Sequence, residues 1–445
     1  MTSRLIARVC GPAMMCFWAP GAWAQLSTPA TPVVGLRTRA EDAQSPQQPP
    51  RLLNLPLLTP REDQLPVSLT LEQALGEAEA RSPAVIAAQA RVEAAKARVR
   101  QAGVRSNPEL SIQVENFGGT GQISGIRSAE TTVAINQSLD FGGRRQTRKT
   151  AARADLAAEE LRLAIARADL AQAVREQFAK AVTAAEKFRI STENDALARE
   201  IARITSILVK EGREAPLRAI RARSAAAQAA AELEAARAEE QASRNTFASL
   251  FGATVPPKDL QGGLLDLRPH AVNPEQSLDV RLADAQRLRA EAEVAQESSV
   301  ARLNPAVGLG VRHMQDTGNV GLVAGVSMAL PLFDRNRGNI AAAKADLRAA
   351  EANFASVAAS ARVRARNAIT NVEAAGARVA ALEKSAVPEA AEALRLAQLS
   401  YAEGRATLLE LFDAQNAYRD VQSALVEARL AQALATAELG RASAQ

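Results

Sequence analysis

Apolar residues occupy every second position in four short stretches of the chain, at 109–117, 130–140, 305–313 and 320–331. The positions between them hold mostly small or polar residues, so each stretch predicts a β-strand with one apolar face. Strands of about ten residues joined by Gly-rich loops are typical of transmembrane β-structure. Ordinary hairpins beside a helical domain fit the same periodicity and stay open as the alternative.

The rest of the pattern is mainly helical. Residues 144–209 contain neither Pro nor Gly, and Leu156, Leu163 and Leu170 recur at heptad spacing. At 1.5 Å per residue such a helix extends about 100 Å, which is longer than a globular domain of this size accommodates. Similar spacing resumes at Ile340. Taken alone, these helices also fit a solvated coiled-coil stalk.

Three landmarks recur in the same order at nearly one offset, which indicates a duplication. The pairs are Asn107 and Asn304, 197 residues apart; Leu139 and Leu332, 193 apart; and Glu211 and Glu403, 192 apart. We therefore expect a first repeat at 67–252 and a second at 253–445. Each repeat then contains one pair of strands and one interrupted helical tract, with turns at 210–217 and 402–409.

Composition favours long, thin helical packing. Ala accounts for 98 of the 445 residues, whereas aromatic residues make up only 3%. Ala has the highest helix propensity, but it fills little volume in a core. With two Tyr, two Trp and a net charge of +5, the chain offers no basic and aromatic platform, so no nucleic-acid partner is expected.

The first 24 residues are expected to form a secretory signal peptide, because a basic start and a short apolar run lead to a small-x-small pattern ending at Ala24. Both cysteines, Cys10 and Cys16, lie in it, and Cys16 sits in a poor lipidation motif. Residues 25–66 hold eight prolines and are expected to be extended. Helical periodicity starts after Thr70, a predicted N-cap. No later apolar stretch is long enough for a membrane-spanning helix.

Four strands are too few to close a barrel, since the smallest membrane barrels have about eight. An open strand edge in lipid leaves backbone groups unpaired, at a cost of several kcal/mol each. Several chains must therefore share one barrel if the strands cross a membrane. The expected fold is an internally duplicated α+β membrane protein, in which four strands per chain enter an outer-membrane β-barrel shared by a rotational oligomer; a trimer would give a 12-stranded barrel. That barrel would continue into a long periplasmic α-helical barrel.

Three motifs accompany the repeat: Glu115-Asn116-Phe117-Gly118-Gly119, Ala129-Glu130-Thr131-Thr132 and Gly142-Gly143-Arg144-Arg145. With them, the chain from Leu69 to Arg441 resembles the TolC-like outer-membrane efflux protein family, and its branch serving cobalt–zinc–cadmium resistance pumps. The resemblance implies a homotrimeric exit duct in the cell outer membrane, passing heavy-metal cations. It also implies a periplasmic membrane-fusion adaptor, a proton-driven inner-membrane pump of the resistance–nodulation–division type, and outer-membrane lipid as partners.

The resemblance further implies that the adaptor docks at the two helix turns. The candidate docking residues are Glu211, Gly212 and Arg213 in the first turn and Glu403, Gly404 and Arg405 in the second. Family members often have aliphatic residues beside this glycine, whereas this chain has Glu and Arg. The departure suggests a partner of complementary charge. A plain hairpin turn is the simpler interpretation of the glycines themselves.

Just inside the second turn, Glu410 and Asp413 are three residues apart and share a helix face. The resemblance places them at the family's periplasmic gate, where a threefold axis would stack two carboxylate rings that favour cations. Without it, a solvated charge pair is the simpler interpretation. Tyr401 matches a family position whose hydroxyl helps to hold the mouth closed. Arg218 stands in place of its acidic partner, so that contact is expected to differ here.

No catalytic motif is apparent. His270 and His313 are isolated, without a cluster that could cage a metal. Gly308-Leu309-Gly310 lacks the third glycine and the following helix of a dinucleotide fingerprint. We therefore expect a passive channel that is not an enzyme and holds no cofactor or resident metal. Alternatives are a similar duct for multidrug efflux or type I protein secretion and, in another class, a periplasmic coiled-coil adaptor or scaffold.

Overall fold

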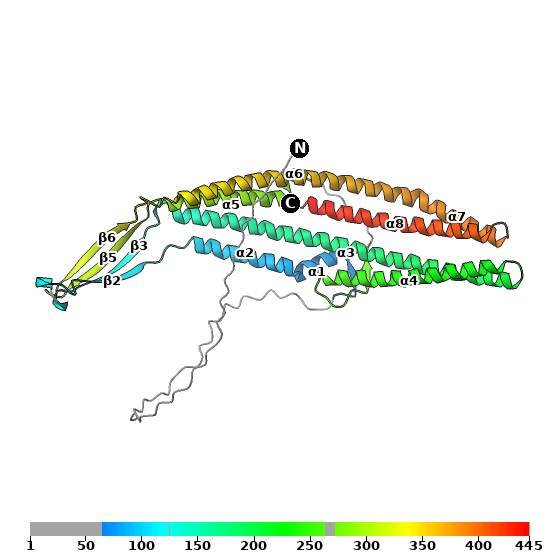
Figure 1. Ribbon diagram of the computed structural model, residues 1–445, viewed down its shortest axis with the longest axis horizontal. Coiled ribbons are helices and arrows are strands. Elements are labelled where there is room, and N and C mark those ends of the chain that lie inside the picture. Colours follow the sequence, from blue (N-terminus) through cyan, green and yellow to red (C-terminus); the bar gives the residue numbers. More distant parts are fainter. Residues whose placement is uncertain (1–64, 124, 263–271, 445) are drawn as a thin grey trace, which may run out of the picture. The chain divides into compact units, whose positions relative to one another are not determined.

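The computed structural model describes residues 65–123, 125–262 and 272–444, which all belong to one compact unit. The expected signal peptide, Cys16, nearly all of the Pro-rich segment and His270 lie outside the described residues. In chain order the main elements are β1 (Ser68–Thr70), α1 (Leu71–Arg81), α2 (Pro83–Ala102), β2 (Glu109–Glu115), β3 (Glu130–Ser138), α3 (Arg144–Lys210), α4 (Pro216–Ser249), β4 (Asp259–Gln261), α5 (Leu278–Val300), β5 (Pro305–Met314), β6 (Val320–Met328), α6 (Arg337–Ala381), α7 (Val387–Ala402) and α8 (Leu408–Ala442). Strands β2, β3, β5 and β6 lie together at one end of the helices (Figure 1).

The main sheet is antiparallel with the order β2-β3-β5-β6, so strands from the two halves of the chain pair through β3 and β5. The register sets Ile135 opposite Leu309, and both are exposed on one apolar face. Strands β2 and β3 each stop two residues before the expected limit, because Asn116 and Asp140 adopt left-handed backbone angles, with φ of 56° and 48°. Edge strands β2 and β6 each have one neighbour in the described chain.

On the face of the sheet opposite the apolar one, the close approach of β3 and β5 explains why position 310 is glycine. A Cβ atom added at Gly310 would lie 2.6 Å from Ala134 Cβ and 2.7 Å from the Val133 carbonyl oxygen. Real Cβ atoms do not approach the backbone so closely, so only glycine fits without a shift of the strands. On neighbouring β6, a Cβ at Gly325 would meet open space.

The long first helix is confirmed: α3 runs without interruption for 67 residues. Its counterpart in the second half is divided into α6, of 45 residues, a π-helical turn at Leu382–Ala386, and α7, of 16 residues. Pro388 explains the break, since it has no N–H to donate to the Lys384 carbonyl. The N–H of Val387 bonds the Leu382 carbonyl, five residues back, which defines the π turn.

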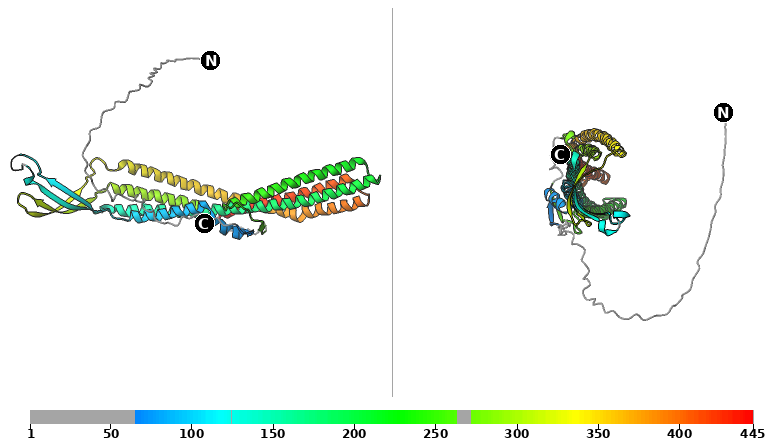
Figure 2. Two further views of the ribbon diagram at one scale, coloured as in Figure 1. Left: turned by 90° about the horizontal axis from the view of Figure 1, so that it is seen from below. Right: turned by 90° about the vertical axis from the view of Figure 1, so that its left-hand side faces the viewer.

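The helices beyond the sheet form a curved layer when seen end-on (Figure 2). Neighbouring contacts run from α4 to α3, from α3 to α8 and from α8 to α7. Nearer the sheet, α2 and α5 pack on α3, and α6 packs on α5 and α8. No helix among the described residues has an apolar stretch of the length and hydropathy needed to cross a membrane.

The bulkiest core lies where α1, α3 and the end of α4 meet the small β1–β4 sheet. Phe247 packs edge-on against Phe178 and Phe251, with ring centroids 6.0 Å and 5.0 Å away. The predicted cap at Thr70 is confirmed, since its hydroxyl accepts from the Gln73 N–H at 3.3 Å. Most buried positions along the other helices are alanines, which allow close helix approach.

Arg441 joins three helices near the end of the chain. Its guanidinium forms ion pairs with Asp169 of α3 and, at 3.0 Å, with Asp279 of α5. Asp279 also pairs with Arg364 of α6 at 3.1 Å. Partial burial would lower the pKa of Arg441, but the two carboxylates outweigh it and the pKa is raised. The end of α8 is thereby fixed to both halves of the chain.

Candidate functional site

Two helix turns lie at the end of the helices farthest from the main sheet, one between α3 and α4 and the other between α7 and α8 (Figure 1). Both turns use the same backbone geometry. Gly212 and Gly404 have φ of 73° and 74°, and the next residue, Arg213 or Arg405, donates its N–H to a carbonyl five residues back at 2.9 or 2.8 Å. This is a glycine-dependent helix ending, present once in each half.

Each turn exposes one arginine. Arg405 lies 3.2 Å from Glu403, and Arg213 lies 3.9 Å from Glu211. Both arginine side chains are largely exposed, at 71% for Arg213 and 79% for Arg405. Exposed pairs of this kind contribute little to stability. These arginines and glutamates are therefore accessible to another molecule at little energetic cost.

Helix α8 begins directly after the second turn with a reciprocal cap. Glu410 N–H donates to the Thr407 hydroxyl at 3.3 Å, and Thr407 N–H donates to the Glu410 carboxylate at 2.6 Å. The Thr407 hydroxyl also donates to that carboxylate, at 3.1 Å. These donors stabilise the charged form and lower the pKa of Glu410, the backbone N–H contributing most.

The rotation of α8 is set by its apolar side. Leu408 and Leu411 are buried against Ile201 of α3 and Leu394 of α7. Glu410 and Asp413 remain on the exposed side of the helix. Asp413 also lines a pocket of about 440 Å³ with Arg221 and Arg419, whereas Glu410 does not. The two predicted gate carboxylates thus share the exposed side but have different surroundings.

The structure does not join Tyr401 to Arg218 within one chain. The Arg218 guanidinium binds Glu214, one turn away in its own hairpin. Tyr401 packs against the cluster around Leu408, and its buried hydroxyl has no hydrogen-bond partner in the described chain. A buried hydroxyl without a partner is costly, and within the described chain nothing offsets this cost at Tyr401.

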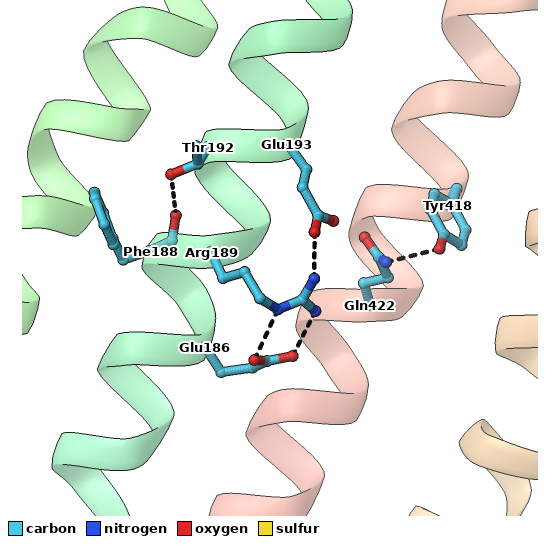
Figure 3. A network of polar contacts seen from close by, with 7 residues as sticks. All are labelled: Glu186, Phe188, Arg189, Thr192, Glu193, Tyr418 and Gln422. Carbon is cyan, nitrogen blue, oxygen red and sulfur yellow. Dashed lines mark hydrogen bonds and ion pairs between the residues drawn. The ribbon is translucent and has the colours of Figure 1, made fainter. Parts of the chain in front are cut away.

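A polar network on α3 and α8 was not predicted from the sequence (Figure 3). On α3, Arg189 donates to both oxygens of Glu186, at 3.0 and 2.6 Å, and pairs with Glu193. Hydrogen bonding from Arg189 lowers the pKa of Glu186. On neighbouring α8, Gln422 donates to the Tyr418 hydroxyl at 2.8 Å. Spacing of three and four residues could have revealed the α3 network.

A second missed contact fixes α8 to α3. Gln415 is only 7% exposed and donates to the Asn194 side chain at 3.0 Å. The residues are 221 positions apart, so spacing along the chain carries no signal for this bond.

The described residues contain no group of three His, Cys, Asp or Glu side chains arranged to hold a metal ion. His313 lies on β5 opposite Thr131 and Val320, with its side chain exposed. The carboxylates at the second turn therefore face solvent as separate charges within one chain.

Comparison with known proteins identifies a family that spans both halves of the chain. The model of the outer membrane efflux protein family matches residues 74–253 and 274–445. The nickel-cobalt-cadmium resistance protein NccC of Alcaligenes xylosoxydans xylosoxydans is 31% identical over 316 residues, covering 69% of this chain and 70% of NccC. The cobalt-zinc-cadmium resistance protein CzcC of Cupriavidus metallidurans is 28% identical over 363 residues, covering 80% of this chain and 85% of CzcC.

Solved structures share the fold. The outer membrane protein VceC of Vibrio cholerae superposes with a TM-score of 0.69 at 23% identity, covering 84% of this chain and 96% of VceC. CusC, described as forming a transmembrane channel, gives a TM-score of 0.71 at 16% identity, covering 90% of this chain and 98% of CusC. At these identities the likeness concerns the fold alone.

Proposed function

The chain belongs to the outer membrane efflux protein family, and from this premise we propose that it is the exit duct for heavy-metal cations such as cobalt, zinc and cadmium. The protein is an outer membrane efflux channel, and members of its family work with an adaptor and an inner-membrane pump. Relatives matching most of the chain carry nickel, cobalt, zinc and cadmium resistance in their names, and this observation supports the cargo. Family membership argues against the scaffold interpretation, since its relatives are channels.

The active form is a homotrimer in this proposal. Each chain has two strand edges, on β2 and β6, that could pair with neighbouring copies. Three chains would then close a barrel of twelve strands in outer-membrane lipid, and each chain would contribute two repeats, 67–252 and 253–445. In the helical layer, exposed apolar side chains on the outermost helices support the same contact: Leu217 and Ile220 on α4, Leu396 and Leu399 on α7.

The two turns dock the periplasmic adaptor, and the gate lies just inside the second turn. Glu410 and Asp413 would line it as rings of carboxylates, while Tyr401 and Arg218 sit on the two hairpins that part on opening. The adaptor would bias this equilibrium toward the open form, with the inner-membrane pump supplying the energy. Support comes from the exposed, charged turns and from the exposed side of α8.

Reversing the charge at the second turn should weaken adaptor docking. In Arg405→Glu, the new carboxylate would stand beside Glu403 and repel an acidic partner surface. We expect cysteine cross-linking to the adaptor in cells to fall severalfold, with channel abundance unchanged. Arg237→Glu, on the exposed side of α4 and well beyond the first turn, is the matched control. Equal cross-linking in Arg405→Glu and the unmodified protein would remove Arg405 from the docking surface.

The charge of Glu410 should depend on its cap. Because Thr407 donors lower its pKa, the carboxylate stays ionised below the pH at which an ordinary Glu, with a pKa of about 4.3, takes up a proton. Thr407→Val removes the hydroxyl and keeps the backbone donor, so the pKa should rise. Cation block, titrated in single-channel recordings, should then disappear at a higher pH than in the unmodified protein. An unchanged midpoint would contradict the role given to the hydroxyl.

The cargo is tested in the native host. Cell-associated zinc, cobalt and cadmium should rise under metal challenge when the protein is deleted, while accumulation of a dye stays flat. Expression of the protein from a plasmid should restore low metal. If dye accumulates and metal does not, the duct serves drug efflux and the metal cargo is wrong.

A further inference from the structure

Basic residues gather where the strands meet the helices. The four connecting regions, 98–108, 139–153, 296–304 and 329–337, are called here the junction band. They contain 11 Arg or Lys residues and only 3 Asp or Glu residues. Their net charge of +8 exceeds the +5 of the whole chain, so the rest of the sequence is slightly acidic. The excess positive charge is therefore confined to the connections between strands and helices, whose place in the fold Figure 1 shows.

Neighbouring carboxylates do not neutralise this charge. Arg144 donates to the carbonyls of Ser299, Val300 and Arg302, at 3.2, 2.6 and 2.5 Å. Arg148 likewise donates to the Val104 carbonyl at 3.2 Å, beyond the end of α2. The guanidinium groups satisfy carbonyl acceptors at the ends of α5 and α2, but these neutral dipoles offset only part of the positive charge.

Two arginines of the junction band have side chains without any polar partner in the described chain. Within the described chain, the side chains of Arg105 and Arg145 form no hydrogen bond or ion pair, and both residues are exposed. Arg98 makes only a long contact, 4.0 Å from Asp155. An anion could therefore bind Arg105 and Arg145 without displacing an existing partner.

Two adjoining pockets collect these side chains. The first, of about 570 Å³, is lined by Arg98, Arg105 and Arg148 together with neutral residues, and no carboxylate lines it. The second, of about 360 Å³, shares Arg105 and adds Arg145, with Asp140 as its single acidic residue. The pair of pockets thus presents four guanidinium groups against one carboxylate, which suits an anion with several oxygen acceptors.

The second pocket lies at the end of β3, beside the apolar face of the sheet. Its lining includes Gln137 and Leu139, which have the same strand parity as Ile135 on that face, together with Ser138 and Asp140 of the other parity. Gln137 donates to the Ser106 carbonyl at 2.9 Å and so links the strand to the lining of the first pocket. Large apolar side chains also stand exposed in the band, with Phe333 98% exposed and Phe141 57%. Basic groups beside exposed apolar ones at a strand end match a membrane interface.

We propose that these pockets bind the phosphate of an anionic phospholipid in the periplasmic leaflet of the outer membrane. The acyl chains would lie along the apolar face beside Ile135, and the headgroup would contact Arg105 and Arg145. The site would set the depth of the protein in the membrane at the level where strands become helices. This inference rests on the outer membrane location and not on the transported cargo.

The test uses the full-length protein reconstituted in phosphatidylcholine vesicles with a small fraction of spin-labelled lipid. Electron paramagnetic resonance measures the lipid held at the protein surface. Spin-labelled phosphatidylglycerol should be preferred over spin-labelled phosphatidylcholine. Arg105→Gln with Arg145→Gln should lower the preference by up to about fivefold per arginine, since each basic group near an anionic surface contributes about that factor. Lysine at both positions should retain most of it.

Arg223→Gln with Arg237→Gln on α4 is the matched control, because it also removes two exposed arginines, both far along the chain from the band. The proposal is overturned if the double glutamine variant keeps the full preference, or if the control loses as much. Inorganic phosphate must displace the labelled lipid no better than chloride at equal ionic strength. Stronger displacement by phosphate would assign the pockets to a free anion instead. Metal accumulation in the host reports separately on the proposed cargo.

Discussion

Neutralising Glu410 and Asp413 together should remove most of the block that a trivalent cation exerts on single channels. Two stacked rings would place six carboxylates around the axis of a trimer, and a trivalent cation gains from each of them. In Glu410→Gln with Asp413→Asn all six charges are lost. We expect the blocking concentration of hexamminecobalt(III) in planar bilayers to rise at least tenfold, or about 1.4 kcal/mol.

The substitutions are chosen to leave α8 intact. Gln can replace Glu in the reciprocal cap with Thr407, so Glu410→Gln removes charge while keeping the helix start. Glu410→Ala would remove both the charge and the cap, so it could not separate their effects. Glu234→Gln with Glu239→Gln, both exposed on α4, removes the same two charges per chain and controls for net charge. Block of equal strength in the double variant would show that these carboxylates do not face the ion path.

Placing a methyl group at Gly310 should destabilise the strand domain far more than the same change at Gly325. The Gly310 Cβ would press on the Val133 carbonyl and on Ala134, so β3 and β5 must separate. Overpacking of this kind costs about 1–3 kcal/mol in each chain. Gly325→Ala, on the same face and with open space around its Cβ, should be nearly neutral.

The measurement is the midpoint of thermal unfolding of the purified protein in detergent, followed by circular dichroism in the β region. Gly310→Ala should lower the midpoint by several degrees relative to Gly325→Ala. Adding Ala134→Gly should recover part of the loss, since it removes the contact with the Ala134 Cβ and leaves the Val133 carbonyl and the Ala134 Cα in place. Equal midpoints for both alanine variants would mean that the strands adjust without strain.

The long elements were predictable because their signals are local. The unbroken α3, the Thr70 cap and the channel family follow from periodicity, capping residues and motifs that can be read within short windows. Alternation likewise places the apolar face of the sheet. Each of these depends on residues near one another along the chain.

Contacts between distant residues were not predictable in the same way. The Gln415–Asn194 bond joins residues 221 apart, and Arg144 reaches a carbonyl 158 residues away. A polar residue on a helix has many possible partners, and the partner depends on how the helices rotate against one another. Pro388 is visible in the sequence, but proline is compatible with a break, a kink or a π turn. The surrounding contacts decide among them.

The π turn at Leu382–Ala386 has a consequence for local opening of the protein. A continuous helix frays from its ends, so the middle of α3 should open only with the whole domain. Its counterpart carries an interior defect, where Pro388 leaves one carbonyl without its usual donor. Hydrogen exchange of the amides around 382–388 should therefore run ahead of exchange near the middle of α3. Two corresponding helical segments in the two halves of the chain would then differ in how often they open.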